Sequence, residues 1–136
     1  MSDLAFIPAV EQARLIRERK VSPVELVELY LERIERLDGG INAFLSVDRE
    51  GALRAAAEID QKRRDGKALG ALAGLPVAVK DALCTIDQPT TCASRMLAGY
   101  RPPYDAEVVS RLRAADAVIV GKTNMGEFAM GGSNEN

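Results

Sequence analysis

Histidine is absent from all 136 residues of the sequence. This absence excludes a Ser-His-Asp triad, a Cys-His dyad and a histidine-ligated metal site from this chain taken alone. Any acid–base chemistry near neutral pH must therefore use a lysine, a cysteine or a carboxylate whose pKa is perturbed.

Cysteine and long hydrophobic runs are also scarce. The two cysteines, Cys84 and Cys92, form no CxxC motif, which argues against zinc sites and thioredoxin-like redox sites. No apolar run approaches the roughly 18 residues that a membrane span requires. The first residues also lack the basic and apolar regions of a signal peptide. Because two isolated cysteines suit a reducing compartment, these features predict a cytoplasmic protein.

The remaining composition is that of a globular domain. Hydrophobic residues make up 47% of the chain and charged residues 28%, and 136 residues are enough for one compact domain. The formal net charge of −2 gives no electrostatic reason to expect binding to nucleic acid or to an anionic membrane.

Helical patterns dominate the first half of the sequence. Residues 8–20 mix apolar and charged residues as an amphipathic helix does. Ser22-Pro23-Val24-Glu25 is a capping box with proline at the first helical position, and the helix that it begins should end at Asp38-Gly39-Gly40. Residues 48–64 predict a third helix, and the glycine-rich residues 66–74 predict a loop.

Strand patterns appear later in the chain. Residues 41–47 are either extended or loop, and residues 76–80 predict a buried strand that begins at Pro76. After the long irregular segment 81–104, Asp105 should cap a helix over 106–115, and a second buried strand should follow over 117–121. This order predicts an α/β fold in which N-terminal helices precede the start of a mixed, largely parallel sheet.

Lys80 is the first candidate for chemistry. It ends an apolar strand, and burial lowers the pKa of a lysine so that its neutral amine can accept a proton. The alternative is an ordinary lysine that reaches solvent or pairs with Asp81. The residues alone leave both interpretations open.

Three other motifs have simple structural interpretations. Gly121-Lys122-Thr123 resembles the end of a P-loop, but Asp116 stands where that motif requires glycine, so a sharp turn after the strand is expected. Gly131-Gly132-Ser133 reads as a plain turn. The apolar residues Met125, Phe128 and Met130 predict either core packing or the wall of a ligand pocket.

Several motifs, in this order, resemble the amidase signature family. They are Gly74-Leu-Pro-Val-Ala-Val-Lys80-Asp81, Thr90-Thr-Cys-Ala-Ser94, Pro103-Tyr-Asp-Ala106, Gly121-Lys-Thr-Asn-Met125 and Glu127-Phe-Ala-Met-Gly131. Within that family the sequence is most similar to the A subunits of glutamyl-tRNA(Gln) and aspartyl-tRNA(Asn) amidotransferases. The resemblance implies the N-terminal portion of a single amidase signature domain, with a helical segment over 1–68 and the start of the α/β core over 69–136.

The resemblance also implies a Ser–cis-Ser–Lys mechanism. In the family a neutral lysine accepts a proton through a bridging serine, and the bridging serine activates a nucleophilic serine that attacks the amide of glutamine. Lys80 matches the catalytic lysine. Phe128, Ala129, Met130 and Gly131 match the loop that lines the substrate pocket. The family's partners are the B and C subunits and, through the complex, tRNA. ATP and Mg²⁺ belong to the partner subunit, so no cofactor or metal is expected in this chain.

The two family serines belong to Gly/Ser-rich motifs downstream of the residues present here. The six serines of the chain, at positions 2, 22, 46, 94, 110 and 133, match neither motif. We therefore expect the isolated chain to be inactive toward glutamine. Two alternatives stay open, namely another amidase signature hydrolase that acts on a free amide, and a non-catalytic fragment.

Two further expectations concern stability. Asp87 stands where the family usually has glycine, and an aspartate would be strained there if the backbone needs a positive φ. A sheet with few strands should also leave an apolar edge and face exposed, which predicts self-association or marginal stability.

Overall fold

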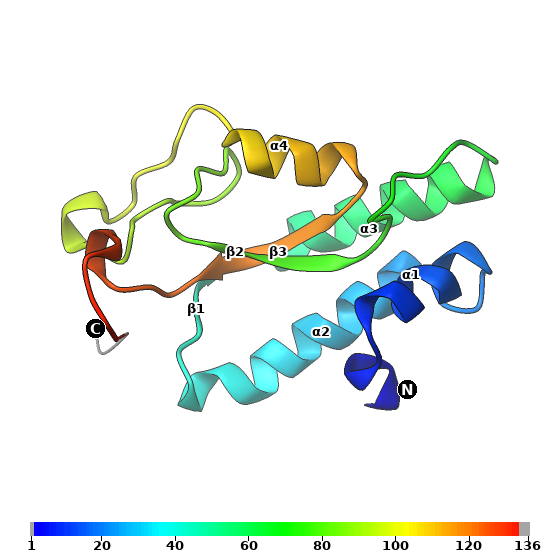
Figure 1. Cartoon of the computed structure of the whole chain (residues 1–136), viewed down its shortest axis with the longest axis horizontal. Helices are drawn as coiled ribbons and strands as arrows, with labels where there is room; N and C mark the ends of the chain where they lie inside the picture. Colours follow the sequence, from blue (N-terminus) through cyan, green and yellow to red (C-terminus); the bar gives the residue numbers. More distant parts are fainter. Residues whose placement is uncertain (1, 134–136) are drawn as a thin grey trace.

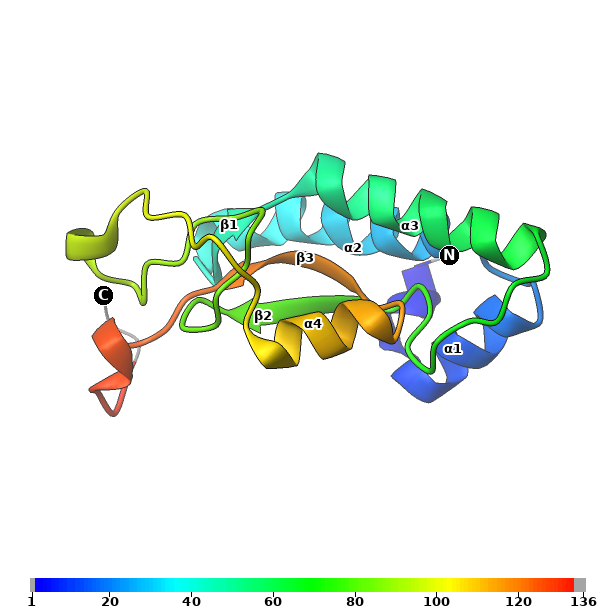
Figure 2. The same cartoon turned by 90° about the horizontal axis from the view of Figure 1, so that it is seen from above.

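A small β-sheet lies between two helical layers (Figure 1). The computed structural model describes residues 2–133. Helices α2 (Pro23–Leu37) and α3 (Arg49–Arg64) cover one face of the sheet, and α4 (Glu107–Ala114) covers the other (Figure 2). Helix α1 (Ala9–Arg17), which follows the short helix η1 (Ser2–Phe6), packs against α2 through an apolar cluster.

The N-terminal helices form where the capping signals predict them. Ser22 Oγ accepts a hydrogen bond from the Glu25 N–H at 3.0 Å, and the Glu25 carboxylate accepts one from the Ser22 N–H at 2.8 Å. The capping box is thereby confirmed, with Pro23 in the first turn of α2. The short helix η2 (Asp38–Gly40) follows α2, and Asp48 caps α3 by accepting a hydrogen bond from the Gly51 N–H.

The sheet is mixed, as predicted. Its strands are β1 (Phe44–Val47), β2 (Pro76–Lys80) and β3 (Val118–Thr123), in the order β1-β3-β2. The central strand β3 pairs antiparallel with β1 and parallel with β2. The parallel pair is joined by α4, which makes β2-α4-β3 a βαβ unit. The segment left open as extended or loop therefore contributes the outer strand β1.

Burial differs between the two predicted strands. In β3 the first five residues are buried, which confirms the prediction of a buried strand. In β2 only Val79 is buried, because β2 is an edge strand with one neighbour. The buried-strand prediction is therefore wrong for most of β2. An edge position depends on which strands pair, and the local sequence does not report that pairing.

The core has one apolar cluster on each face of the sheet. The cluster beneath α2 and α3 is the larger and contains Val27, Leu31, Ala52, Ala56, Ile59, Ala73, Val118 and Val120. The cluster beneath α4 contains Val79, Val109 and Ile119. The alternation of Val118, Ile119 and Val120 between the two faces follows from the two-residue period of a strand. None of the helices within residues 2–133 is long and apolar enough to cross a membrane.

The predicted turn at Gly121-Lys122-Thr123 is wrong, because β3 continues through Thr123. Gly121 is needed there for close approach. A Cβ at this position would lie 2.5 Å from the backbone oxygen of Ser46 in β1 and 2.9 Å from the ring of Phe44. The register of β3 against β2 also shifts beside Gly121, between Val77 and Ala78, and its register against β1 shifts between Phe44 and Ser46. Such shifts are typical of a bulge.

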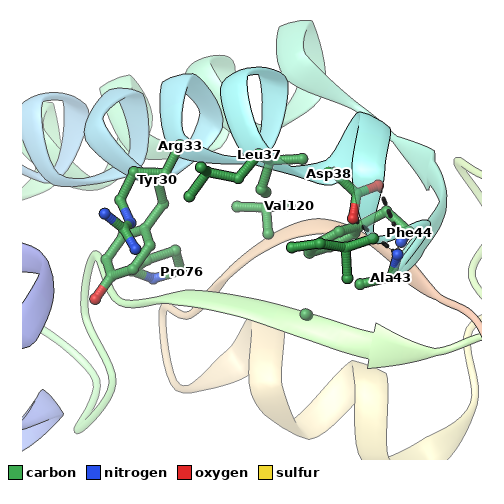
Figure 3. A pocket seen from close by; sticks show the side chains of 11 residues that line it. Tyr30, Arg33, Leu37, Asp38, Ala43, Phe44, Pro76 and Val120 are labelled. Atoms are coloured by element: carbon green, nitrogen blue, oxygen red, sulfur yellow. Dashed lines mark hydrogen bonds between the residues drawn. The ribbon is translucent and has the colours of Figure 1, made fainter.

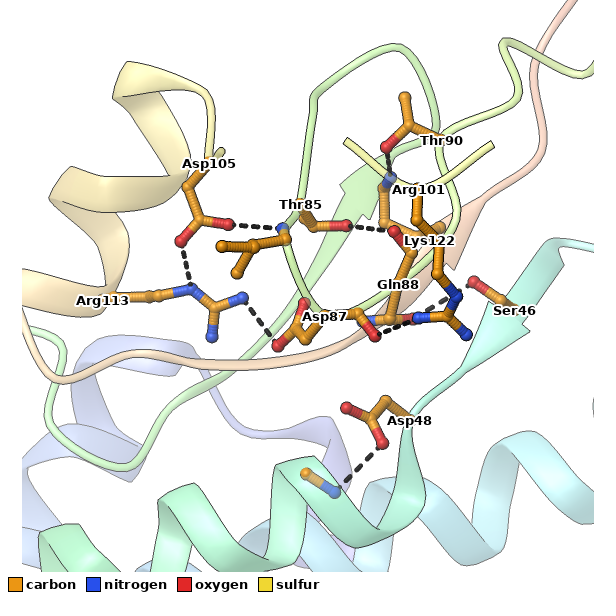
Figure 4. A network of polar contacts seen from close by, with 12 residues as sticks. Ser46, Asp48, Thr85, Asp87, Gln88, Thr90, Arg101, Asp105, Arg113 and Lys122 are labelled. Carbon is orange, nitrogen blue, oxygen red and sulfur yellow. Dashed lines mark hydrogen bonds and ion pairs between the residues drawn. The ribbon is translucent and has the colours of Figure 1, made fainter. Parts of the chain in front are cut away.

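The long segment 81–104 is irregular, as predicted, apart from the short helix η3 (Arg95–Leu97). A polar network holds it against α4 (Figure 4). Arg113 binds the carboxylate of Asp87 at 2.8 Å and that of Asp105 at 3.1 Å. The backbone of Asp87 is not in the positive-φ region, so the expected strain is absent and the carboxylate forms an ion pair instead.

Asp105 does not cap α4, contrary to the prediction. The residue before the helix is Ala106, which makes no side-chain capping bond. The Asp105 carboxylate accepts a hydrogen bond from the Ile86 N–H at 2.8 Å and binds Arg113 within α4. Its partners thus come from the preceding loop and from the last turn of the helix, which a local capping rule does not consider.

Candidate functional site

The predicted site residues lie at the carboxyl ends of the parallel strands β2 and β3. The segment 81–104 and residues 126–133 meet at this end of the molecule, as both views show (Figures 1 and 2). Lys80 is the last residue of β2 and pairs in register with Thr123 at the end of β3. In open α/β sheets this edge is the usual location of ligand sites.

The side chain of Lys80 is exposed. Within residues 2–133 its ammonium group has neither an ion-pair nor a hydrogen-bond partner, so the pairing with Asp81 considered from the sequence does not form. Of the two interpretations left open, the solvent-exposed lysine describes this chain. An unpaired amine at a strand end is accessible to any group that packs on this edge of the sheet.

The buried lysine of this region is Lys122 in β3, with 0% of its side chain exposed. Lys122 Nζ lies 3.0 Å from Asp81 Oδ1 in an ion pair and donates hydrogen bonds to Thr90 Oγ1 at 2.8 Å and to the Pro89 backbone oxygen at 3.1 Å. Figure 4 shows Lys122 pointing toward Thr90 beneath the irregular segment. The ammonium thus has three oxygen neighbours, and two of them, from Pro89 and Thr90, accept its hydrogen bonds.

The two carboxylate oxygens of Asp81 have different partners. Oδ1 faces Lys122, and Oδ2 accepts hydrogen bonds from the Thr91 N–H at 2.9 Å and from Thr91 Oγ1 at 2.5 Å. Only 1% of its side chain is exposed. A buried charge of this kind requires a partner and additional hydrogen bonds, and both are present.

Sequence reasoning missed this buried pair. The signal that could have found it is the position of Lys122 two residues after Val120, within an uninterrupted run of strand-forming residues. A lysine inside a central strand needs an anionic partner, and Asp81 follows directly after the neighbouring strand.

The four residues predicted to line a substrate pocket are exposed at the same end of the sheet. Phe128 and Ala129 lie in the short helix η4 (Glu127–Ala129), with positive φ values of 49° and 59°, and Met130 and Gly131 follow it. Phe128 is 44% exposed and Met130 86%, whereas Met125 is 2% exposed. Core packing is therefore confirmed for Met125 and wrong for Phe128 and Met130. Ser133, which follows them, lies in a bend.

Hydrogen bonds connect this segment to the loop after β2. The Phe128 N–H donates to the Cys92 backbone oxygen at 3.0 Å, and Ser94 Oγ donates to Glu127 Oε1 at 2.7 Å. Cys92 and Ala93 also have positive φ values, of 52° and 54°. Such backbone conformations are costly for residues other than glycine and are found preferentially at functional sites.

Two surface hollows bear on where a ligand could bind. One, of about 490 Å³, lies beside the strand ends and is lined by residues that include Thr91, Ser94, Asn124 and Glu127. The other is an apolar groove of about 360 Å³ between α2 and β2 (Figure 3). The charged groups of the groove have structural partners. The Asp38 carboxylate accepts hydrogen bonds from the backbone N–H groups of Ala43 and Phe44 at the start of β1, and the Arg33 guanidinium stacks on the ring of Phe6. The hollow at the strand ends is therefore the better candidate site.

No metal centre emerges from the described part of the chain. Within residues 2–133, no three cysteine, aspartate or glutamate side chains are grouped so that they could hold a metal ion.

Comparison with known proteins identifies the family of this chain. The profile of the Amidase family matches residues 25–136, which are most of the sequence. The chain belongs to the amidase signature family. The matched range includes the family motifs around Lys80 at the end of β2 and around Gly121 in β3.

The most informative relatives are A subunits of glutamyl-tRNA(Gln) amidotransferase. The subunit from Salinispora arenicola is 53% identical over 135 residues, which are 99% of this chain and 28% of the relative. The subunit from Streptomyces coelicolor is 52% identical over 136 residues, and that from Aromatoleum aromaticum is 58% identical over 118. The chain thus spans about a quarter of the length of the relatives that it matches.

Solved amidase structures share the fold. A bacterial aryl acylamidase superposes with a TM-score of 0.90 at 27% identity, with 96% of this chain and 27% of the acylamidase covered. The peptide amidase from Stenotrophomonas maltophilia gives 0.88 at 34% identity, with 94% of this chain and 26% of that enzyme covered. The A subunit from Thermotoga maritima gives a TM-score of 0.65 at 38% identity, with 83% of this chain and 22% of that subunit covered. The predicted fold class is confirmed.

Proposed function

We propose that this chain is the N-terminal part of a glutamine-hydrolysing A subunit of glutamyl-tRNA(Gln) or aspartyl-tRNA(Asn) amidotransferase. The observation that carries the proposal is identity of 52–53% to A subunits over 99–100% of the chain. Lys80 ends β2 without a partner among residues 2–133, so its amine is free to contact the serines that the rest of the protein supplies. The protein that contains this segment releases ammonia from glutamine, and the ammonia converts Glu-tRNA(Gln) or Asp-tRNA(Asn) to the amide form.

In the proposed reaction Lys80 is the proton acceptor. The hydroxyl of a nucleophilic serine adds to the side-chain carbonyl carbon of glutamine, and its proton passes through a bridging serine to Lys80. The C–N bond then breaks, the proton goes to the leaving nitrogen, and ammonia departs. Water hydrolyses the resulting ester to glutamate and restores the serine. Because both serines belong to motifs beyond these residues, the chain by itself does not turn over glutamine.

The remaining assignments follow from the same proposal. Residues 128–131 contribute one wall of the glutamine pocket. The B and C subunits complete the complex and bring the tRNA, and the partner subunit uses ATP with Mg²⁺. The free thiols of Cys84 and Cys92 are consistent with work in the cytoplasm, where thiols stay reduced.

A second candidate is an amidase that acts on a free amide without tRNA. The structural comparison favours it, because the TM-score is 0.90 for an aryl acylamidase and 0.65 for the A subunit from Thermotoga maritima. Sequence identity favours the A subunit. We give identity more weight, because one fold hosts many activities and the substrate is chosen by side chains at the site.

The test is the substitution Lys80→Ala in the full-length protein that carries this segment, measured by release of ammonia from glutamine. Activity should fall about 10²–10⁴-fold, which is the usual contribution of a positioned proton acceptor. Lys67→Ala is the matched control, because Lys67 is an exposed lysine in the loop before β2, at the opposite end of the strand. Wild-type activity in Lys80→Ala would refute the role of Lys80. Full activity toward small amides with no effect of B and C subunits or tRNA would favour the second candidate.

A further inference from the structure

Lys80 is followed by a residue that is held at four points. The Asp81 N–H donates to the Thr123 backbone oxygen at 3.1 Å, and its own backbone oxygen accepts from the Cys92 N–H at 3.1 Å. Its carboxylate binds Lys122 on one oxygen and Thr91 on the other. With both the backbone and the side chain of Asp81 fixed, the chain direction at Lys80 is fixed as well.

Lys122 connects this point to a second segment. Its ammonium reaches the Pro89 oxygen and Thr90 Oγ1, so residues 89–91 are held against the end of β2. The same loop continues to Cys92, whose backbone oxygen accepts from the Phe128 N–H. The buried pair thus joins the strand that carries Lys80 to the segment that carries residues 128–131.

The position of the pair distinguishes it from another, largely buried ion pair in this chain. Asp60 and Arg63, with 5% and 12% of their side chains exposed, lie near the end of α3, away from the strand ends. That pair joins α3 to the last turn of α1 and the loop after it, through the backbone oxygens of Ile16 and Val21. It therefore stabilises the fold without contacting the candidate site.

We propose that Asp81 and Lys122 are positioning residues, which hold Lys80 and the loop at 128–131 in their mutual geometry. The inference rests on the proposed role of Lys80 as proton acceptor. Neither residue touches the reacting atoms: the carboxylate and the ammonium are buried and occupied by each other and by Thr90 and Thr91. Their effect on the reaction passes through the backbone, and a small displacement of a catalytic group lowers the rate constant steeply.

The test compares four variants with the wild type, all in the full-length protein. Lys122→Met leaves Asp81 as an unpaired buried charge and lowers both the melting temperature and kcat. The double variant Asp81→Asn/Lys122→Met removes both charges and keeps the size of both side chains, so the melting temperature should largely recover. If the pair positions Lys80, kcat of the double variant stays about 10–100-fold below wild type while KM for glutamine changes by less than about threefold.

Arg63→Met is the matched control. It breaks the remote buried pair, so it lowers the melting temperature but leaves kcat per folded molecule unchanged. Thr90→Val removes the hydrogen bond from the Lys122 ammonium and a long one, at 3.5 Å, from Thr90 Oγ1 to the Leu83 backbone oxygen, and it keeps the ion pair and the side-chain shape. It should lower kcat less than the double variant does, and it supplies the measurement if the double variant does not fold.

Two results would overturn the inference. The pair is merely structural if the folded double variant keeps the wild-type kcat. If the double variant does not fold, a wild-type kcat in Thr90→Val leads to the same conclusion. Lys80→Ala distinguishes the proposals: if it abolishes hydrolysis while those variants keep kcat, only the positioning role is wrong. If Lys80→Ala keeps its activity, the proposed function and the inference both fail.

Discussion

The turn between α4 and β3 gives a sharp test of the electrostatics of this fold. The Asp116 carboxylate accepts hydrogen bonds from Lys62 Nζ at 2.8 and 3.0 Å and from the Gly70 N–H at 2.6 Å. It therefore ties α3 and the glycine-rich loop to the start of β3. We expect the substitution Asp116→Asn to destabilise the chain at neutral pH and to leave its fold unchanged.

The magnitude follows from what asparagine keeps and loses. Its amide oxygen can still accept from the Gly70 N–H, and asparagine tolerates the φ of 64° at this position. It loses the attraction to Lys62. A hydrogen bond to a charged group contributes about 1.5–3 kcal/mol, and screening reduces this value, because the Lys62 side chain is 35% exposed. We expect a loss of about 1–2 kcal/mol, which lowers the melting temperature by about 3–8 °C.

The loss should depend on pH. Burial of Asp116 raises its pKa, but the hydrogen bonds from Lys62 and from the Gly70 N–H outweigh burial, and the net pKa is lowered. A carboxylate whose pKa is lowered by folding stabilises the native state above its unfolded pKa, about 3.9 for aspartate. This stabilisation is lost as the pH falls through the native pKa. The difference between wild type and Asp116→Asn should therefore be constant from pH 7 to 5 and shrink below about pH 4.

Urea denaturation followed by circular dichroism at a series of pH values measures this difference. Asp65→Asn is the control, because Asp65 is an exposed acid at the end of α3 whose carboxylate accepts from the Gln61 side chain. Its unfolding free energy should differ from wild type by less than about 0.5 kcal/mol. A difference for Asp116→Asn that stays constant down to pH 3, or that grows on acidification, would refute the reasoning.

Three other predictions concern packing, capping and exposed surface. Gly70→Ala should lower the unfolding free energy by about 2 kcal/mol, because its Cβ would lie 2.3 Å from the backbone oxygen of Ala115. Gly39→Ala is the control: no atom lies within 4 Å of its new Cβ, so its unfolding free energy should stay close to wild type in the same denaturation assay. Ser22→Ala removes the cap of α2 and should lower the unfolding free energy by about 1 kcal/mol in urea denaturation. A loss below about 0.2 kcal/mol would contradict this prediction. The isolated chain should associate as its concentration rises, because the β2 edge and the groove beside α2 are exposed; sedimentation velocity that shows a monomer at every concentration tested would be the opposite result.

Much of the fold could be predicted because its signals are local. The capping box at Ser22, the stop after Leu37 and the cap at Asp48 each act within one or two helical turns. The apolar run of β3 also reads correctly as a strand. The prediction at Asp105 failed for the same reason: its partners are Ile86 and Arg113, and Ile86 lies 19 residues away in the chain.

The amino-acid sequence by itself determined the family, the order of helices and strands, and the position of Lys80 at the end of a strand. Only the tertiary structure decided burial and pairing. It made β2 an edge strand, left Lys80 exposed, and placed Lys122 beside Asp81 with Thr90 above it. The physical reason is that helix capping and strand propensity depend on neighbouring residues, whereas burial of a charge depends on which distant segments meet, 41 residues apart for Asp81 and Lys122.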